Sequence, residues 1–159
     1  MNEKSHWVFR AHVLDRAGAL TSIASAFSNE GISIDTVVGH GFEEHAGVDG
    51  SVVLTFCCTE DEKDILVRKV KRLSKVTRLE EHPYDSQKLR KSAIVLTSRR
   101  LRPHDVAGDE SFVTCELVYA GTADWTYFLA GSPSELDPVL ASLETAGVVK
   151  DIVYSVVGI

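Results

Sequence analysis

The chain has 159 residues, of which 44% are hydrophobic, and its formal net charge is −6. This length suits one ordinary domain or two small ones, and the acidic balance argues against nucleic acid as a partner. The N-terminus lacks the apolar run of a signal peptide, and no window approaches the roughly 18 to 20 apolar residues of a membrane span. We therefore expect a cytoplasmic protein without a membrane partner. The three cysteines imply no disulfide framework.

The first half of the chain predicts alternating strands and helices. Aromatic and β-branched residues with partial alternation predict a strand over residues 7–14. A turn at Gly18 then opens a helix, and Gly31 is placed to supply its left-handed C′ residue. Helical spacing predicts a buried face for this helix that consists of Leu20, Ile23, Ala24 and Phe27.

A hairpin and a second helix complete this half. Strands are predicted over residues 32–38 and 48–57, with a loop rich in glycine and charge between them. Thr59 and Glu62 have the spacing of a capping box, ahead of an apolar stripe formed by Ile65, Leu66, Val70 and Leu73. With a fourth strand at 76–82, the order β-α-β-β-α-β predicts a ferredoxin-like unit, an antiparallel sheet with two helices on one face.

The second half predicts a related unit. Strands are expected at residues 92–97, 112–119, 125–129 and 148–157, while residues 98–110 read as a loop. A helix face is formed by Leu136, Val139, Leu140 and Leu143. Its start is open, because Ser132 with Pro133 and Asp137 with Pro138 are alternative cap and first-turn pairs. We predict the α+β class, with residues 1–83 and 92–159 as ferredoxin-like domains joined by a connector at 84–91, the second domain having lost or shortened its first helix.

The glycine turn is the most suggestive site in the sequence. The N–H groups of Ala19 and Leu20 are predicted to lie free at the helix start, where the helix dipole favours a small carboxylate. The plain alternative is that Gly18 only makes a turn. The six histidines form no metal-binding motif, and neither a nucleophile elbow nor a phosphate-binding glycine loop is present, so we expect no metal, cofactor or catalysis.

A second candidate site is a cluster of arginines in the central loop. Arg99, Arg100 and Arg102 follow one another closely there, and the cluster suits an acidic partner surface or a phosphate.

The segment Asp15-Arg16-Ala17-Gly18-Ala19-Leu20, followed by Gly31-Ile32-Ser33-Ile34-Asp35, resembles the pattern of ACT domains, small ferredoxin-like modules that bind amino acids. Over nearly its full length the chain is similar to the small regulatory subunits of acetolactate synthase. In that family an ACT domain is followed by a second ferredoxin-like domain, entered through a connector and strand like residues 89–96.

The resemblance implies a subunit without an active site of its own that regulates the thiamine-diphosphate-dependent large subunit of acetolactate synthase. It implies feedback by valine or another branched-chain amino acid at the interface of a homodimer, and it leaves further pairing into tetramers open. The residues that it assigns to the ligand are Asp15, Ala17, Gly18, Ala19, Leu20, Ser33 and Ile34.

The chain departs from the family pattern at several positions. Ala17 stands where ACT turns carry proline, and Ser33 where the small subunits usually carry asparagine, so a shorter hydroxyl replaces an amide. The third strand also lacks the family's usual Ser-Arg pair. Two alternatives therefore stay open: a free-standing ACT regulator similar to glycine-cleavage regulators and, less favoured, an enzyme on the same scaffold.

Overall fold

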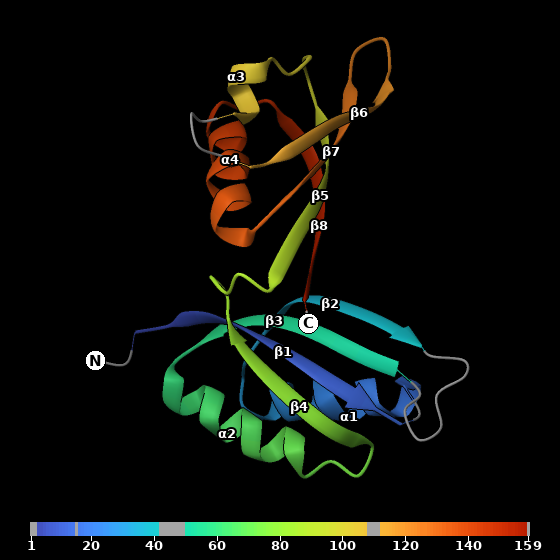
Figure 1. Cartoon of the computed structure of the whole chain (residues 1–159), viewed down its shortest axis with the longest axis vertical. Helices are drawn as coiled ribbons and strands as arrows, with labels where there is room; N and C mark the ends of the chain where they lie inside the picture. The colour runs from blue at the N-terminus through green and yellow to red at the C-terminus, as the bar shows by residue number, and fades with distance from the viewer. Residues whose placement is uncertain (1–2, 15, 42–49, 108–111, 159) are drawn as a thin grey trace. The chain divides into compact units, whose positions relative to one another are not determined.

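The computed structural model describes residues 3–14, 16–41, 50–107 and 112–158, and the chain divides into two compact units (Figure 1). Unit 1 comprises Met1–Ser86 with Gly158–Ile159, and unit 2 comprises Gln87–Val157. Each unit has a four-stranded sheet and a hydrophobic core of its own. The predicted α+β class with two ferredoxin-like units is confirmed.

Unit 1 consists of β1 (Ser5–Val13), α1 (Arg16–Asn29), β2 (Ile34–Gly41), β3 (Gly50–Cys58), α2 (Glu60–Lys71) and β4 (Val76–Pro83). The strand order is β2-β3-β1-β4, with antiparallel neighbours, and both helices cover one side of the sheet (Figure 1). The core lies between sheet and helices. Its centre is three phenylalanines, in which the Phe56 ring lies edge-on to Phe9 at 4.7 Å and to Phe27 at 4.8 Å.

The start of α1 differs from the prediction. The helix already begins at Arg16, so Gly18 lies within its first turn instead of in a turn ahead of it. Its buried face contains Ala19, Ile23, Ala26 and Phe27, whereas the predicted core residues Leu20 and Ala24 are exposed. The buried face of α1 is rotated relative to the prediction, because Ala19 faces the sheet. Its side chain is so small that the sequence pattern did not mark it as a core residue.

The end of α1 follows the prediction. Gly31 has a left-handed φ of 68°, the N–H of Ile32 donates to the Phe27 carbonyl, and the N–H of Gly31 donates to that of Ser28. These two bonds form a Schellman motif, which requires a C′ residue with positive φ. The predicted Thr59 capping box at the start of α2 is also present, with both of its hydrogen bonds.

The hairpin of β2 and β3 extends further than predicted. Residues 39–41, expected in a loop, continue β2 and pair with β3, where His40 lies opposite Ser51. Gly50 is the first residue of β3, and a Cβ there would lie 2.1 Å from the His40 carbonyl oxygen, so only glycine permits this close approach. The predicted strand residues 48 and 49 lie outside the described residues.

Unit 2 consists of β5 (Leu89–Thr97), α3 (Pro103–Val106), β6 (Thr114–Ala120), β7 (Trp125–Gly131), α4 (Pro133–Thr145) and β8 (Val149–Gly158). Its strand order, β6-β7-β5-β8, places the strands as in unit 1, and α4 covers one side of the sheet (Figure 1). The strand β5 begins three residues before its predicted start at residue 92, because Leu89 and Lys91 are buried like the core residues that follow them.

The segment predicted as a loop over residues 98–110 contains one helical turn, α3. Pro103 occupies the first helical position, and the Asp105 carboxylate accepts the N–H of Arg102. Leu101 and Val106, on either side of this turn, pack against the core of unit 2. The first helix of the ferredoxin-like pattern is therefore shortened to α3. In place of a full helix, the side chains of Leu101 and Val106 cover this part of the core.

The alternatives for the start of α4 are also resolved. The helix begins at Pro133, after Ser132, and contains Pro138 within it. The hydroxyl of Ser132 lies 2.7 Å from a carboxylate oxygen of Glu135, and the Ser132 carbonyl accepts the N–H groups of Glu135 and Leu136. Pro138 is exposed and, because it has no N–H, it removes the hydrogen bond to the Ser134 carbonyl in the second turn of the helix. No helix among the described residues is long and apolar enough to cross a membrane.

Candidate functional site

The first group of predicted ligand residues lies at the beginning of α1. Ala17 is exposed, Gly18 half-buried and Ala19 fully buried, while Leu20 exposes 37% of its surface. Asp15 lies outside the described residues. The chain that leads into this helix is held against unit 1, since the N–H of Leu14 donates to the Lys75 carbonyl at 2.8 Å.

The donors in this first turn are not those that the sequence predicted. In a helix that begins at Arg16, the N–H of Leu20 faces the Arg16 carbonyl within the i to i−4 ladder. The N–H groups without an intrahelical acceptor are then those of the first turn, up to Gly18, and Gly18 already takes part in another interaction. The helix start still offers N–H groups to a carboxylate, but these groups lie one or two residues closer to the N-terminus than the sequence predicted.

The second group, Ser33 and Ile34, lies at the beginning of β2. Ser33 is exposed and follows directly on the Schellman motif of α1, and Ile34 is half-buried against the core of unit 1. Asp35, the next residue, lies 3.7 Å from the imidazole Nε2 of His6 on β1. This group offers a short hydroxyl at the C-terminal end of α1, beside a carboxylate.

Within one chain the two groups are far apart. Ile34 and Trp7 both pair with Phe56, so Ile34 lies level with the start of β1. Val13, which precedes α1, is six residues further along β1, about 20 Å at the usual rise per strand residue. A free amino acid is too small to contact both groups. A complete pocket that uses both would need the beginning of α1 from one copy and the beginning of β2 from another.

The sequence pattern did not reveal an ionic cluster on the helix-free side of the unit 1 sheet. The Glu80 carboxylate on β4 lies 3.4 Å from His12 Nε2, 2.6 Å from a guanidinium nitrogen of Arg78 and 3.7 Å from one of Arg10. Burial raises the pKa of the Glu80 carboxyl, but the hydrogen bond from His12 and the charges of the two arginines outweigh it and lower that pKa. The alternation of Arg10 and His12 with core residues of β1 is the signal that indicates this polar face.

Two buried lysines were also missed. Lys63 Nζ lies 2.8 Å from Asp64 and 4.6 Å from the centre of the Trp7 ring, and the hydrogen bond with Asp64 raises the pKa of this amine. Lys91 Nζ lies 2.6 Å from Asp137 and 4.2 Å from the centre of the Tyr154 ring. Each ammonium is thus held by a carboxylate and an aromatic face, an arrangement that accounts for its burial.

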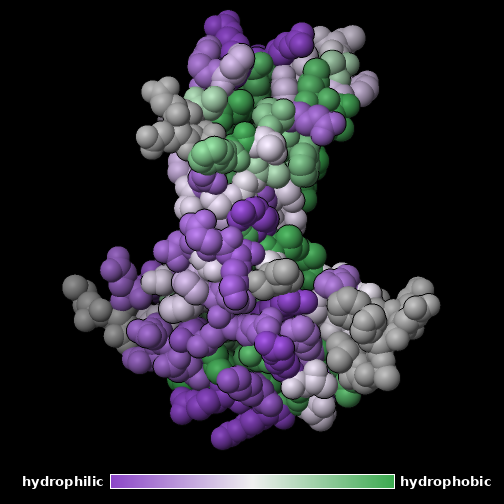
Figure 2. Space-filling view, in the orientation of Figure 1, coloured by the Kyte–Doolittle hydropathy of each residue, from purple (hydrophilic) through white to green (hydrophobic). Residues whose placement is uncertain are grey.

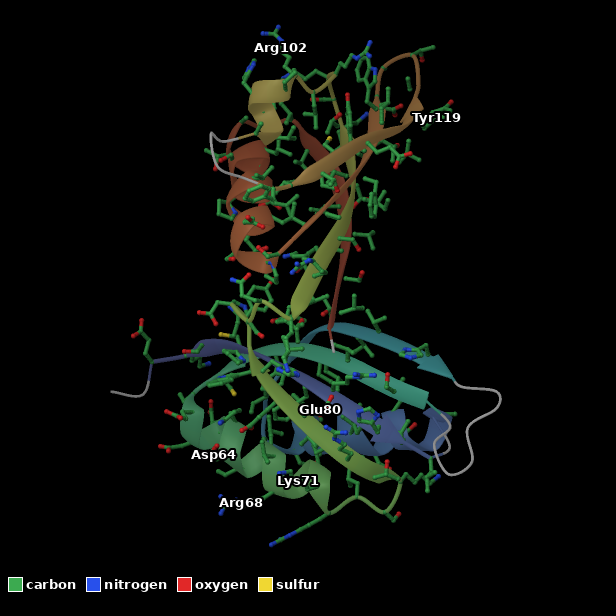
Figure 3. The ribbon with its side chains drawn as sticks, viewed as in Figure 1. Asp64, Arg68, Lys71, Glu80, Arg102 and Tyr119 are labelled. Carbon is green, nitrogen blue, oxygen red and sulfur yellow. The ribbon has the colours of Figure 1, made fainter. Side chains whose placement is uncertain are left out.

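The arginine cluster of unit 2 is divided between two roles. Arg99 donates two hydrogen bonds of 2.9 Å to the Asp105 carboxylate, so its charge is compensated within the chain. The hydrogen bonds from Arg99 and from the Arg102 backbone hold the pKa of Asp105 well below its usual range. Arg100 and Arg102 are exposed, and Arg102 extends away from α3 (Figure 3). Only these two remain candidates for a partner surface.

No three histidine, cysteine or acidic side chains come together as a metal site within the part of the chain that the structure describes. Four of the histidines lie on strands, namely His6, His12, His40 and His82. His104 belongs to α3, and His45 lies outside the described residues.

Comparison with known proteins shows which known fold this chain shares. No protein family model and no curated protein sequence matches the chain. Among solved structures, the acetolactate synthase small subunit from Thermotoga maritima is similar over 99% of this chain and 96% of its own, with a TM-score of 0.67 at 13% identity. The likeness shows the fold alone.

A weaker similarity connects the chain with the regulatory subunit of aspartate kinase from Thermus thermophilus. That structure has a TM-score of 0.48 at 12% identity and covers 89% of this chain and 92% of its own.

Proposed function

We propose that this protein is an amino-acid-sensing regulatory subunit, that its target is the large subunit of acetolactate synthase, and that its effector is a branched-chain amino acid such as valine. The ligand lies at the interface of a homodimer in the cytoplasm, between the beginning of α1 in one copy and the beginning of β2 in the other.

The observation that supports this function best is the likeness in fold over both units. The Thermotoga maritima structure, an acetolactate synthase small subunit, matches 99% of this chain. A match confined to unit 1 would favour a general ACT regulator, whereas a match that includes unit 2, with its shortened first helix, favours the two-unit regulatory subunit. The resemblance at Gly18 and Gly31 points in the same direction.

The separation of the two residue groups supports a shared site. With about 20 Å between them along the sheet, one chain offers either the first-turn N–H groups or Ser33, but not both, to a small ligand. Two copies related by a two-fold axis would place each group beside its complement and create two equal sites. The N–H groups and the dipole of α1 then bind the carboxylate, and the Ser33 side binds the rest of the amino acid.

Amino-acid binding is tested by thermal unfolding of the purified protein with each of the twenty amino acids. We expect a branched-chain amino acid to raise the melting temperature, because a ligand that binds only the folded state stabilises it. Gly18→Asp should abolish the shift, since a carboxylate in the first turn suits the helix dipole but repels the ligand's carboxylate. Ala24→Asp, an exposed position of the same helix, is the matched control and should keep the shift.

Ser33→Asn is the complementary variant. The amide restores a group that both donates and accepts hydrogen bonds, and we expect it to bind the same amino acid more tightly than the wild type does. A protein whose melting temperature responds to none of the twenty amino acids, in the wild type and in Ser33→Asn, would refute the sensor.

The partner is tested separately, by copurification with an acetolactate synthase large subunit and by the effect on its activity. We expect the full chain to raise that activity and to make it sensitive to the amino acid. Amino-acid binding without association with the large subunit would favour the free-standing regulator, with the exposed Arg100 and Arg102 in contact with a different partner.

A further inference from the structure

The strand β6 is a weakly protected edge of the unit 2 sheet. Proteins usually protect edge strands with charges or proline, because the outward N–H and C=O groups of an edge can pair with another strand. The edge strand β4 has three charged residues and a proline, and β8 has a lysine followed by an aspartate. In β6 the only charged residue is Glu116. The remaining edge, β2, also has a single charge, but it begins at the ligand site proposed above.

The whole of β6 is also accessible. Every residue of the strand is exposed to solvent. Tyr119 exposes 64% of its surface and points outward in Figure 3, and Phe112, just before the strand, exposes 84%. Figure 2 shows hydrophobic side chains gathered on the side of unit 2 where β6 lies. The single turn of α3 covers less of its sheet than the 14-residue α1 does in unit 1, so this edge stays open.

The first part of β6 is a regular strand that is held in place from within unit 2. Val113 packs over Gly131 of β7, where an added Cβ would lie 3.4 Å from the valine side chain. The pairing with β7 is regular from Thr114 onward, and a register shift between Leu117 and Tyr119 then marks a bulge. A bulge disrupts the ladder and twists the edge, so the usable part of the edge is residues 114–117.

We propose that residues 114–117 bind an extended segment of a partner protein, which adds to the unit 2 sheet as a further strand beside β6. In this mode of recognition the backbone hydrogen bonds supply the affinity, and the side chains that alternate along the added strand supply the specificity. Because the edge is already ordered, the protein loses little conformational freedom when the segment binds.

The side chains of β6 define the chemistry of that segment. Cys115 and Leu117 lie opposite the buried residues of β7, on the side of the sheet that α4 covers, whereas Glu116 lies opposite Phe128 on the other side. A matching segment therefore has a lysine or arginine opposite Glu116, between two apolar residues that lie beside Cys115 and Leu117.

A second copy of β6 is a poorer occupant of this edge. In an antiparallel pair of two copies, Glu116 would lie opposite its own counterpart or within one step of it along the ladder. Like charges that face each other across strands are destabilising, whereas opposite charges stabilise the pair. The partner segment is thus basic where β6 is acidic.

Nuclear magnetic resonance of the full chain, without any amino acid effector, tests this edge. The probes are two peptides with blocked ends, Thr-Val-Lys-Val-Thr and Thr-Val-Glu-Val-Thr. We expect the lysine peptide to shift the amide signals of residues 114–117 and to bind at least about twofold more tightly than the glutamate peptide. Glu116→Lys should reverse this order. The matched control is Asp151→Lys, the same change of charge at an exposed position of the other edge strand, β8, and it should keep the wild-type order.

Two N-methylated forms of the lysine peptide separate strand addition from contact between side chains alone. One form is methylated at its second and fourth residues, and the other at its first, third and fifth. Because alternate N–H groups of an added strand point toward β6, one form should lose binding and the other should keep it.

Three results would overturn the proposal: no shift of the β6 amide signals with either peptide, the same peptide order in the wild type and in Glu116→Lys, or an equal effect of the two N-methylated forms. Circular dichroism shows whether each variant is folded, and the N-methylated forms test the wild type itself. Since neither an amino acid effector nor the large subunit is present, the result is independent of the function proposed above.

Discussion

At the scale of single residues, Asp105 shows how one carboxylate organises the segment that replaces a helix. It accepts both hydrogen bonds from Arg99 and the backbone N–H of Arg102, and its side chain is only 11% exposed. The arginine that appeared available in the sequence is thereby used inside the chain. The remaining cations of this segment, Arg100 and Arg102, are the ones that a partner can reach.

Asp105→Asn should lower the free energy of unfolding of the protein by about 1–2 kcal/mol at neutral pH. The native pKa of Asp105 lies below its unfolded value, so its stabilising contribution is complete above about pH 4 and is lost as the pH falls further. Urea unfolding at several pH values should show a difference between wild type and variant that shrinks on acidification.

Asp124→Asn is the matched control for this prediction. It removes a carboxylate from a solvent-exposed pair with Lys150, whose atoms are 3.8 Å apart, and should leave stability nearly unchanged. A difference between the wild type and Asp105→Asn that is the same at pH 3 and at pH 7 would contradict the ionic role of Asp105.

At the scale of elements, α1 and α4 end in the same way. Gly147 has a φ of 70°, the N–H of Val148 donates to the Leu143 carbonyl, and the N–H of Gly147 donates to that of Glu144. This repeats the arrangement at Gly31, and in both units an apolar residue follows the glycine into the next strand. The ends of these two helices are determined locally, by a residue that tolerates a left-handed backbone.

Gly31→Ala and Gly147→Ala should each destabilise the protein by about 1 kcal/mol, because an L side chain is strained at positive φ. A Cβ at either position has no atom within 4 Å, so backbone strain is the only expected cause. Chemical denaturation measures the loss. Asparagine at the same positions should destabilise less than alanine, since it tolerates the left-handed region better, and equal losses for the two would count against this explanation.

At the scale of the whole molecule, the chain contains two cores that share no residue among those the structure describes. Leu54 and Leu129 are both fully buried, the first among the aromatic side chains of unit 1 and the second among the leucines of α4. Each sheet consists of strands from its own unit. We therefore expect the two units to lose their structure separately when one core is weakened.

Leu129→Ala should destabilise unit 2 by about 2–5 kcal/mol through the cavity that it leaves. Hydrogen exchange followed by mass spectrometry should show faster exchange in residues 87–157 and unchanged protection in unit 1. Leu54→Ala should give the reverse pattern. Faster exchange in both units from either variant would mean that the two cores unfold together.

The order of the elements was readable from the sequence because its signals are local. The alternation in β1, the Thr59 capping box and the glycines at the helix ends each act within a few residues, and all three are present in the structure. The buried face of α1 was misplaced for the opposite reason. Burial of Ala19 depends on the angle at which the helix packs on its sheet, and local sequence patterns do not predict that angle.

Sequence by itself determined the two ferredoxin-like units and their helix ends, since short-range hydrogen bonding and periodicity decide them. Only the tertiary structure decided that Gly18 belongs to α1, that Ser33 lies at the other end of the sheet, and that Arg99 is held by Asp105. These facts depend on strand register and on contacts between residues that local pattern does not connect. The same holds for five apolar residues on the helix-free side of the unit 2 sheet, which come from four strands and become neighbours only when the sheet has formed: Ile94, Leu96, Tyr119, Phe128 and Val153.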